Sequence, residues 1–292
     1  MLCWAINESS KIQTIGLCHS VQHTAAQLSG DLEIPESDLE YVAGGINHMS
    51  FFLKLEKVAE QGNIDLYPQL RERAKGQIPL RKVSNAVALS DAVRYEVFRR
   101  TGFFVTESSE HFAEYVPWFI KQNRQDEIDK YKIPIEEYID RCESNVKLWN
   151  DLEKDMTPIH NQSLKRSNEY ASFIMDGVAN NNEVTINANV MNDGYIDNLP
   201  SNCCVEVPCI INAKGISPQK FGRLPEHLAA LMRTNINVQI LTAEAAMTKK
   251  REHIYHAALL DPLTAANLTI DEIYSMTDKM IEAHQNYLPK YN

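Results

Sequence analysis

Apolar and polar positions in the first third of the chain predict helices and strands in alternation. Residues 1–10 resemble the end of a helix, and the apolar run at 11–17 predicts a strand. Helical spacing follows at 20–32, and Pro35 then opens the next short segment. Residues 39–57 alternate well enough for two strands, with the Gly44-Gly45 pair as the expected break between them.

The rest of the chain is mostly helical, with one clear β region. An amphipathic helix is expected up to Gly102, with Ser90 as its N-cap, and a turn into a second helix follows at 108–121. Further segments are a charged helical stretch at 124–180, a strand, Asn-Asp-Gly turn and strand at 183–215, and helices from Pro225 onward. This order predicts an α+β fold.

The composition limits which kinds of molecule the chain is expected to bind and in which compartment it is expected to lie. The chain has 292 residues and a formal net charge of -10, which argues against nucleic acid or an anionic membrane as the main partner. No apolar run reaches the length of a membrane span, and the first residues do not have the pattern of a secretory signal. Six cysteines without regular spacing indicate free thiols in a reducing compartment, so a cytoplasmic location is expected.

Cys18 and His48 are the candidate metal ligands. A thiolate and an imidazole are good ligands for borderline divalent metals, and a catalytic ion leaves positions open for substrate oxygens and water. The competing interpretation is structural, because a lone cysteine or histidine among apolar neighbours is more often a core residue. Spacing alone does not decide between the two. Cys203, Cys204 and Cys209 are predicted to be core residues, since adjacent cysteines in a strand point to opposite faces.

Several long motifs, in order, resemble one family of enzymes. They are TIGLCHSVQ, AGGINHMSFFLKLE, VRYEVFRRTGFFVTESSEHFAEYVPWF, IDNLPSNCCVEVPC and LMRTNINVQILTAEAA. These motifs closely resemble those of the α-galactosidase branch of the NAD-dependent glycoside hydrolases of family 4. The resemblance runs along essentially the whole chain, but the Gly-rich phosphate-binding motif of the family's N-terminal Rossmann domain does not occur in it.

The resemblance implies a domain division and a reaction. Residues 1–20 would be the end of the Rossmann domain. Residues 21–292 would be the C-terminal metal and substrate domain, similar to that of lactate dehydrogenase and the family 4 glycosidases, with a mixed or antiparallel sheet packed with many helices. In the intact protein, NAD would oxidise the sugar C3 hydroxyl, a base would remove the C2 proton, and the aglycone would leave by elimination before water adds and the ketone is reduced.

Site residues also follow from the resemblance. The family's metal-binding cysteine matches Cys18 and its metal-binding histidine matches His48, with manganese as the usual ion. Asn47 would contact sugar hydroxyls. His19 occupies the position where phospho-glucosidase relatives carry an aspartate that acts as the general acid, a task that histidine can perform near neutral pH.

The catalytic base is left open among three residues. Relatives that prefer phosphorylated sugars use a tyrosine near the segment 107–111, where this chain has Glu107, Glu110 and His111 among its residues. A helix start with acidic side chains that complement the helix dipole explains the same pattern without catalysis. Arg94 is a candidate substrate-binding residue. For Arg94 and for Arg233, a surface charge or structural ion pair is the slightly preferred interpretation.

The resemblance therefore leaves three functions to compare. The first is the metal and substrate domain of an α-galactosidase that acts on melibiose or a raffinose-type sugar, inactive without the Rossmann domain and assembled as a homo-oligomer. The second is a non-catalytic module that binds a sugar or a metal. The third is an oligomerisation partner of intact family members.

Overall fold

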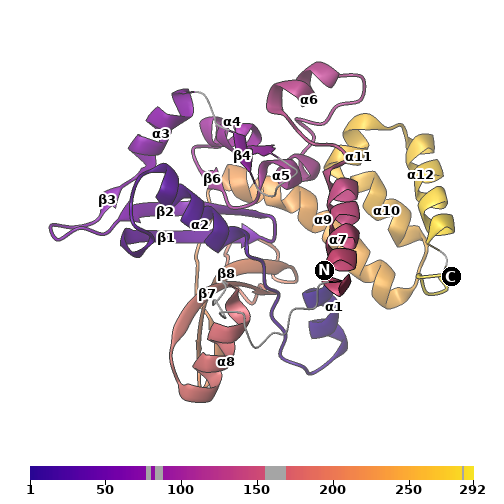
Figure 1. Cartoon of the computed structure of the whole chain (residues 1–292). Helices are drawn as coiled ribbons and strands as arrows, with labels where there is room; N and C mark the ends of the chain where they lie inside the picture. The colour runs from indigo at the N-terminus through magenta and orange to yellow at the C-terminus, as the bar shows by residue number, and fades with distance from the viewer. Residues whose placement is uncertain (77–79, 83–87, 155–168, 285) are drawn as a thin grey trace.

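The computed structural model describes residues 1–76, 80–82, 88–154, 169–284 and 286–292, and Figure 1 shows their arrangement. The first half contains α1 (Leu2–Ser9), α2 (Ser20–Asp31), a 3-10 turn (Glu36–Asp38), β1 (Leu39–Ile46), β2 (Met49–Lys57), β3 (Ile64–Asp65), α3 (Tyr67–Lys75), β4 (Leu80–Lys82), β5 (Ala88–Ser90), α4 (Ala92–Thr101), β6 (Phe104–Val105), α5 (Ser109–Tyr115) and α6 (Gln125–Tyr131). The second half contains α7 (Glu137–Lys154), α8 (Tyr170–Asn180), β7 (Val184–Met191), β8 (Cys204–Asn212), β9 (Gly215–Pro218), α9 (Glu226–Thr248), α10 (Glu252–Leu260), α11 (Pro262–Asn267) and α12 (Ile270–Ala283).

One antiparallel sheet organises the chain. Its strands run in the order β3-β2-β1-β8-β7, with β6 paired to β2 and β9 paired to β8. The hairpin of β1 and β2 is in register from Leu39 opposite Lys57 to Ile46 opposite Met49, and β8 joins β1 where Gly45 lies opposite Glu206. The described residues thus confirm an α+β fold with a mostly antiparallel sheet packed with many helices.

Both faces of the sheet are covered by helices. Phe51 and Phe52 are neighbours in β2, and because strand side chains alternate they enter two different cores. Phe51 packs edge-on against Phe112 of α5, in the core that α9 also joins. Phe52 packs in a second core with α2, α3 and α4. The turn end of the hairpin is therefore buried without interruption, at residues 43–46 and 49–52, as expected for strands that are covered on both sides.

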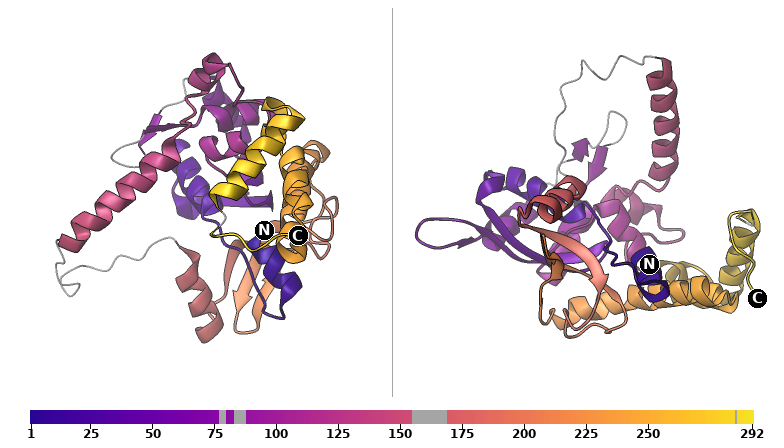
Figure 2. Two further views of the ribbon diagram at one scale, coloured as in Figure 1. Left: turned by 90° about the vertical axis from the view of Figure 1, so that its right-hand side faces the viewer. Right: turned by 90° about the horizontal axis from the view of Figure 1, so that it is seen from below.

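Two helical regions extend from this centre. In both views of Figure 2, α7 projects away from the sheet, while α9 to α12 run from orange to yellow at the C-terminal end of the chain. The helices predicted after Pro225 are thereby confirmed. None of the helices in the described part of the chain is both long and apolar enough to cross a membrane.

Most predicted elements of the first half are confirmed, and three details are wrong. The segment at 11–17 is not a strand, since it forms only one isolated bridge, from Gly16 to Asn189. β1 continues through Gly44-Gly45, and the chain turns instead at Asn47 and His48. The N-cap of α4 is Asp91, one residue after the expected Ser90, whereas the helix does end at Gly102 with a left-handed φ of 81°. Of the predicted helical stretch 124–180, residues 155–168 lie outside the described residues.

Gly45 allows three strands to approach closely at the centre of the sheet. Its φ is +152°, and a Cβ there would lie 2.7 Å from the Met49 carbonyl oxygen and 2.8 Å from the Ser50 Cα. Backbone atoms cannot move aside as the end of a flexible side chain can. Glycine is therefore required beside the turn that carries His48.

We predict that Gly45→Ala lowers the free energy of unfolding by about 3 kcal/mol, because the added methyl group meets backbone and the positive φ is strained for alanine. Urea unfolding followed by circular dichroism measures the change. Gly30→Ala is the matched control, since Gly30 lies in α2 with no atom within 4 Å of an added Cβ. An equal loss of stability in both variants would contradict the explanation.

Candidate metal and sugar site

Three side chains with metal-binding atoms meet beside the central hairpin. The Cys18 sulfur, a His48 ring nitrogen and a Glu107 carboxylate oxygen all lie within 4.8 Å of one another. Cys18 precedes α2, His48 is in the turn between β1 and β2, and Glu107 follows β6. The site therefore depends on the fold, because segments nearly 90 residues apart in sequence must pack at the turn end of the β1–β2 hairpin.

His48 is held in a strained but well-supported conformation. Its φ is +65°, a left-handed value that is uncommon for a residue other than glycine and is typical of functional sites. Nδ1 lies 3.1 Å from the Tyr115 hydroxyl, and Nε2 lies 3.3 Å from a Glu107 oxygen. Burial lowers the pKa of His48, while the Glu107 carboxylate opposes this effect. The neutral imidazole that results is the form that binds metals.

Cys18 and Glu107 are fixed by short local contacts. The Cys18 thiol donates to the Ser20 hydroxyl at 3.2 Å, and burial raises the pKa of this thiol. One oxygen of Glu107 accepts hydrogen bonds from the backbone N–H of Ser108 at 2.9 Å and from its hydroxyl at 3.1 Å. The other Glu107 oxygen faces His48. When the thiol ionises, its negative charge lies close to that of the buried carboxylate. A cation between the three groups would offset this repulsion.

The other predicted residues surround this cluster. His19 caps α2 and is largely exposed, with Nδ1 3.8 Å from a Glu169 oxygen. His111 stacks on His48, with the ring centroids 6.0 Å apart, and hydrogen bonding to Glu114 raises the pKa of His111. Glu110 is buried beside it in α5, in agreement with the acidic helix start noted in the sequence.

Arg94 lies beneath the site and is only 2% exposed. Its Nε and Nη2 contact an Asp91 oxygen at 3.1 and 3.0 Å, and its Nη1 donates to the Thr24 hydroxyl at 2.9 Å and to the Glu107 carbonyl at 3.5 Å. These contacts are those of a structural brace that positions the segment of Glu107. Arg233 likewise makes structural contacts, to the Asn198 carbonyl at 2.9 Å and to Glu226 at 3.8 Å.

Tyr115 was missed by the sequence analysis, which considered residues 107–111 and found no tyrosine there. It lies four residues after His111 in α5, so one face of the helix carries both rings. Tyr115 packs edge-on against His48, with the centroids 5.7 Å apart. This i,i+4 spacing within ESSEHFAEY is the signal that could have identified it.

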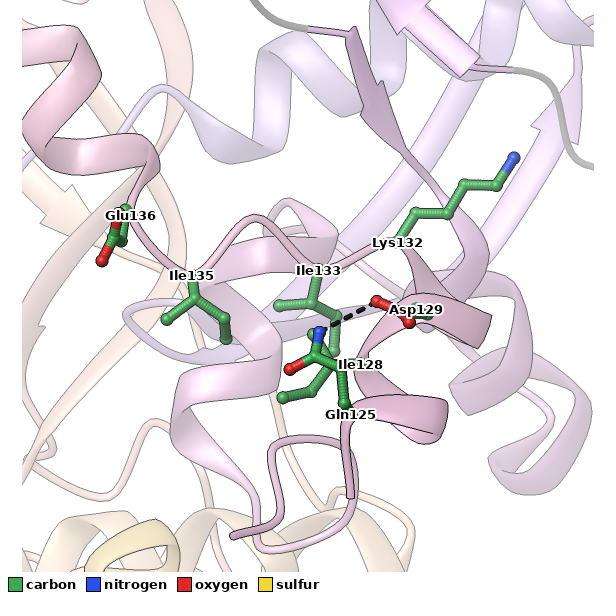
Figure 3. Close-up of a pocket in the computed structure, with 7 residues that line it drawn as sticks. All are labelled: Gln125, Ile128, Asp129, Lys132, Ile133, Ile135 and Glu136. Carbon is green, nitrogen blue, oxygen red and sulfur yellow. Dashed lines mark hydrogen bonds between the residues drawn. The ribbon is translucent and has the colours of Figure 1, made fainter. Parts of the chain in front are cut away.

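Two cavities adjoin the cluster. The α9 cavity has a volume of about 590 Å³ and is lined by Asn47, Tyr115, Asn189, Asn235 and Gln239 together with the start of the chain. The α2 cavity measures about 250 Å³ and has His19, Glu107 and His111 in its wall. A third hollow, of about 590 Å³, lies between α6 and the start of α7 (Figure 3). Unlike the first two, it contains neither a cluster residue nor a sequence neighbour of one. The first two are therefore the candidates for substrate.

Glu206 adds an unusual charge near the cluster. It lies in β8 and is fully buried, one oxygen accepts a hydrogen bond from the Ser50 hydroxyl across Gly45, and the other has no partner among the described residues. Burial raises the pKa of Glu206 to about 7; the Ser50 hydrogen bond lowers it and the Glu107 charge raises it further. Cys203, Cys204 and Cys209 in and beside the same strand are buried, which confirms them as core residues.

Comparison with known proteins places this geometry in a family. Residues 43–264 match the family 4 glycosyl hydrolase C-terminal domain. The chain belongs to glycosyl hydrolase family 4. It is 42% identical over 290 residues to an α-galactosidase of Bacillus subtilis (strain 168), and 32% identical over 305 residues to an α-galactosidase of Rhizobium meliloti (strain 1021). The predicted membership of this family is confirmed.

The match covers only part of these family 4 proteins. It spans 99% and 100% of this chain but 65% and 59% of the two α-galactosidases, in their C-terminal part. Among solved structures, a putative glucosidase from Bacillus subtilis has a TM-score of 0.77 at 23% identity, covering 92% of this chain and 63% of that one. A 6-phospho-α-glucosidase in complex with NAD and Mn2+ has a TM-score of 0.72 at 16% identity, covering 95% and 62%. These structures share the fold.

We predict that Cys18→Ser weakens Mn2+ binding at least about tenfold, because a hydroxyl cannot supply the thiolate charge. Equilibrium dialysis of anaerobically prepared protein, with bound manganese measured by atomic absorption, tests this. Cys142→Ser is the matched control, since Cys142 is an exposed free cysteine on α7. Equal manganese content in both variants would show that Cys18 is a buried structural thiol.

We predict that Glu206→Gln removes a pH-dependent loss of stability. A carboxyl whose pKa rises from 4.5 to about 7 on folding stabilises the protein fully below pH 4.5, and this contribution is lost as pH rises through 7. The variant should therefore gain stability relative to wild type between pH 5 and pH 8, by on the order of 3 kcal/mol at most. Urea unfolding at four pH values measures this, with exposed Glu60→Gln as the control. A constant difference across that range would refute the assignment.

Proposed function

We propose that this chain is the metal- and sugar-binding part of an α-galactosidase that uses NAD-dependent oxidation of the substrate. The observation that carries the proposal is the cluster of Cys18, His48 and Glu107 within the family 4 fold. The two relatives named α-galactosidases support the choice of substrate. In this proposal residues 1–20 end a dinucleotide-binding domain and contribute Cys18 at the junction, and residues 21–292 form the domain that supplies the other metal ligands and binds the sugar.

The donor set of the cluster fits a divalent ion of the manganese type. Sulfur, nitrogen and oxygen donors converge from three segments, and the adjoining cavities leave space for substrate oxygens. Cys18, His48 and Glu107 would hold the ion, which when bound supplies Lewis acidity to the oxygens of the sugar. Tyr115 keeps the His48 ring oriented through Nδ1, so that Nε2 lies toward Glu107 and would be available to the ion.

The remaining residues bind the sugar and move protons. Asn47 lines the α9 cavity beside His48 and is placed to hydrogen-bond sugar hydroxyls. His19 would donate a proton to the glycosidic oxygen as the bond breaks. The base at C2 is one of the groups of α5 and its approach: Glu107 when it does not bind the ion, Glu110, His111 or Tyr115. NAD, in the intact enzyme, supplies the hydride acceptor for C3.

Charge in the site favours a substrate without phosphate. Glu107, Glu110 and Glu114 lie around the His48 ring or in the adjoining cavity walls, and their carboxylates would repel a phosphate dianion. A non-phosphorylated α-galactoside, such as melibiose or a raffinose-type sugar, is the proposed substrate. A reducing cytoplasm, which keeps Cys18 free, and assembly as a homo-oligomer belong to the same proposal.

We predict that this chain alone has no glycosidase activity and gains it when the N-terminal third of the Bacillus subtilis relative is joined before Met1. With NAD, Mn2+ and a reducing agent, the fused protein should cleave melibiose and not its 6-phosphate. In D2O, the galactose released should carry deuterium at C2, because elimination removes that proton. Mass spectrometry and NMR of the product measure this.

The controls separate the parts of the proposal. The fused Cys18→Ser variant should lose activity, whereas fused Cys142→Ser should keep it. Turnover without deuterium at C2 would exclude elimination. Faster cleavage of the phosphorylated sugar would refute the substrate assignment, and turnover by the chain alone would refute the need for a dinucleotide-binding domain.

A further inference from the structure

The His48 ring contacts one side chain from each of two cavities. His111, which lines the α2 cavity, stacks on the ring with an interplanar angle of 13°. Tyr115, which lines the α9 cavity, meets the same ring at 85°. A ligand bound at the metal cluster can therefore extend into both cavities. An α-galactoside has two such halves, joined by the bond that is to be cleaved.

The lining of the α2 cavity mixes polar groups with carbon surface. Every residue in its wall carries a hydroxyl, amide, imidazole, carboxylate or guanidinium group, although apolar surface makes up most of the exposed wall, as it does in the α9 cavity. Its two arginines offset part of its acidic charge, and Arg94 is already paired with Asp91. A wall of this kind without an excess of positive charge suits a neutral sugar, which has hydroxyls and apolar C–H faces, better than a phosphate. Its volume of about 250 Å³ suits one small group.

One face of α2 supplies a row of side chains to this cavity. His19, His23 and Gln27 follow one another at spacings of four residues, and the rings of His19 and His23 have centroids 4.7 Å apart. The amide nitrogen of Gln27 donates to an Asp91 oxygen at 2.9 Å, which leaves its amide oxygen for a ligand hydroxyl. The row thus begins at the proposed proton donor and leads away from the metal cluster.

The start of the chain lies at the opposite cavity. Met1, Leu2 and Cys3 line the α9 cavity, and the family relatives carry their additional residues before the part that this chain matches. In the proposed function those additional residues bind NAD, so the sugar ring that is oxidised must face them. The α9 cavity is consequently the place for the galactosyl ring, and the departing group must lie on the side of His19.

We propose that the α2 cavity is the binding site for the leaving group, and that it selects a single neutral, hydroxylated sugar unit through His23 and Gln27. This inference rests on the proposed function, since it divides the α-galactoside between the two cavities. Neither residue belongs to the metal cluster or to the proton-transfer groups. They determine which aglycone is accepted and not whether the bond is cleaved.

The test compares two ligands on the chain loaded with Mn2+. Methyl α-galactoside fills the α9 cavity alone, and melibiose, galactose linked to glucose, fills both. Saturation-transfer NMR titration gives the two dissociation constants and shows whether the glucose protons touch the protein. In wild type the glucose protons should receive saturation, and melibiose should bind more tightly than methyl α-galactoside.

Matched glutamine variants assign the cavities. Gln27→Leu in the α2 cavity should weaken melibiose about fivefold, the effect of one lost hydrogen bond, and change methyl α-galactoside less than twofold. Gln239→Leu in the α9 cavity should weaken both ligands alike. His23→Leu provides a second variant of the α2 cavity with the expected pattern of Gln27→Leu, and thermal unfolding checks that each variant is folded.

The outcomes distinguish the two proposals. If Gln27→Leu and His23→Leu leave melibiose binding unchanged, or weaken both ligands equally, the leaving-group site is refuted while the galactoside function stands. If wild type binds neither ligand in the presence of Mn2+, the proposed function itself fails.

Discussion

The hairpin of β1 and β2 is the constraint on which the site depends. Its register ends in a two-residue turn with His48 at a positive φ, and Gly45 beside the turn leaves room for the neighbouring strands. Both cores pack on this hairpin, α2 brings Cys18 to it from one face, and β6 pairs with β2 and thereby delivers Glu107. The candidate metal site of Cys18, His48 and Glu107 is therefore built by tertiary packing around one strand pair, with little contribution from any local motif.

Acidic groups concentrate at the same place, and their arrangement explains why a cation fits there. Glu107 is buried against His48, and Glu206 is fully buried below. Burial raises the pKa of the Cys18 thiol, and the charges of Glu206 and Glu107, when they are ionised, raise it further. Without a cation, this part of the protein keeps its charge low through a protonated thiol, a neutral imidazole and a carboxyl at Glu206 that holds its proton up to about pH 7. The ion would replace protons as the source of charge balance.

The sequence was sufficient for the class of fold and for most elements, because helical and alternating patterns are local properties. The prediction of a strand at 11–17 is wrong, because the backbone of this segment pairs with only one described residue, Asn189, and strand formation depends on such distant pairing. The Gly44-Gly45 pair was predicted to be a turn because glycine is common in turns. In the structure the pair lies inside β1, where a side chain would collide with neighbouring atoms. The i,i+4 spacing places Tyr115 on the same helix face as His111, but its contact with His48, like the burial of Glu206, depends on distant elements that no local pattern specifies.

The helix α5 links the two cavities of the proposed substrate site. His111 and Tyr115 lie one turn apart on it and both contact the His48 ring, so a small rotation of α5 would alter both cavities together. Phe112, between them in sequence, is fully buried against Phe51 of β2, which resists such a rotation. The apolar contact of α5 with the sheet thus fixes how the two cavities lie relative to the ring. For a substrate that spans both cavities as proposed, the length that fits would depend on the core as much as on the polar residues that line the cavities.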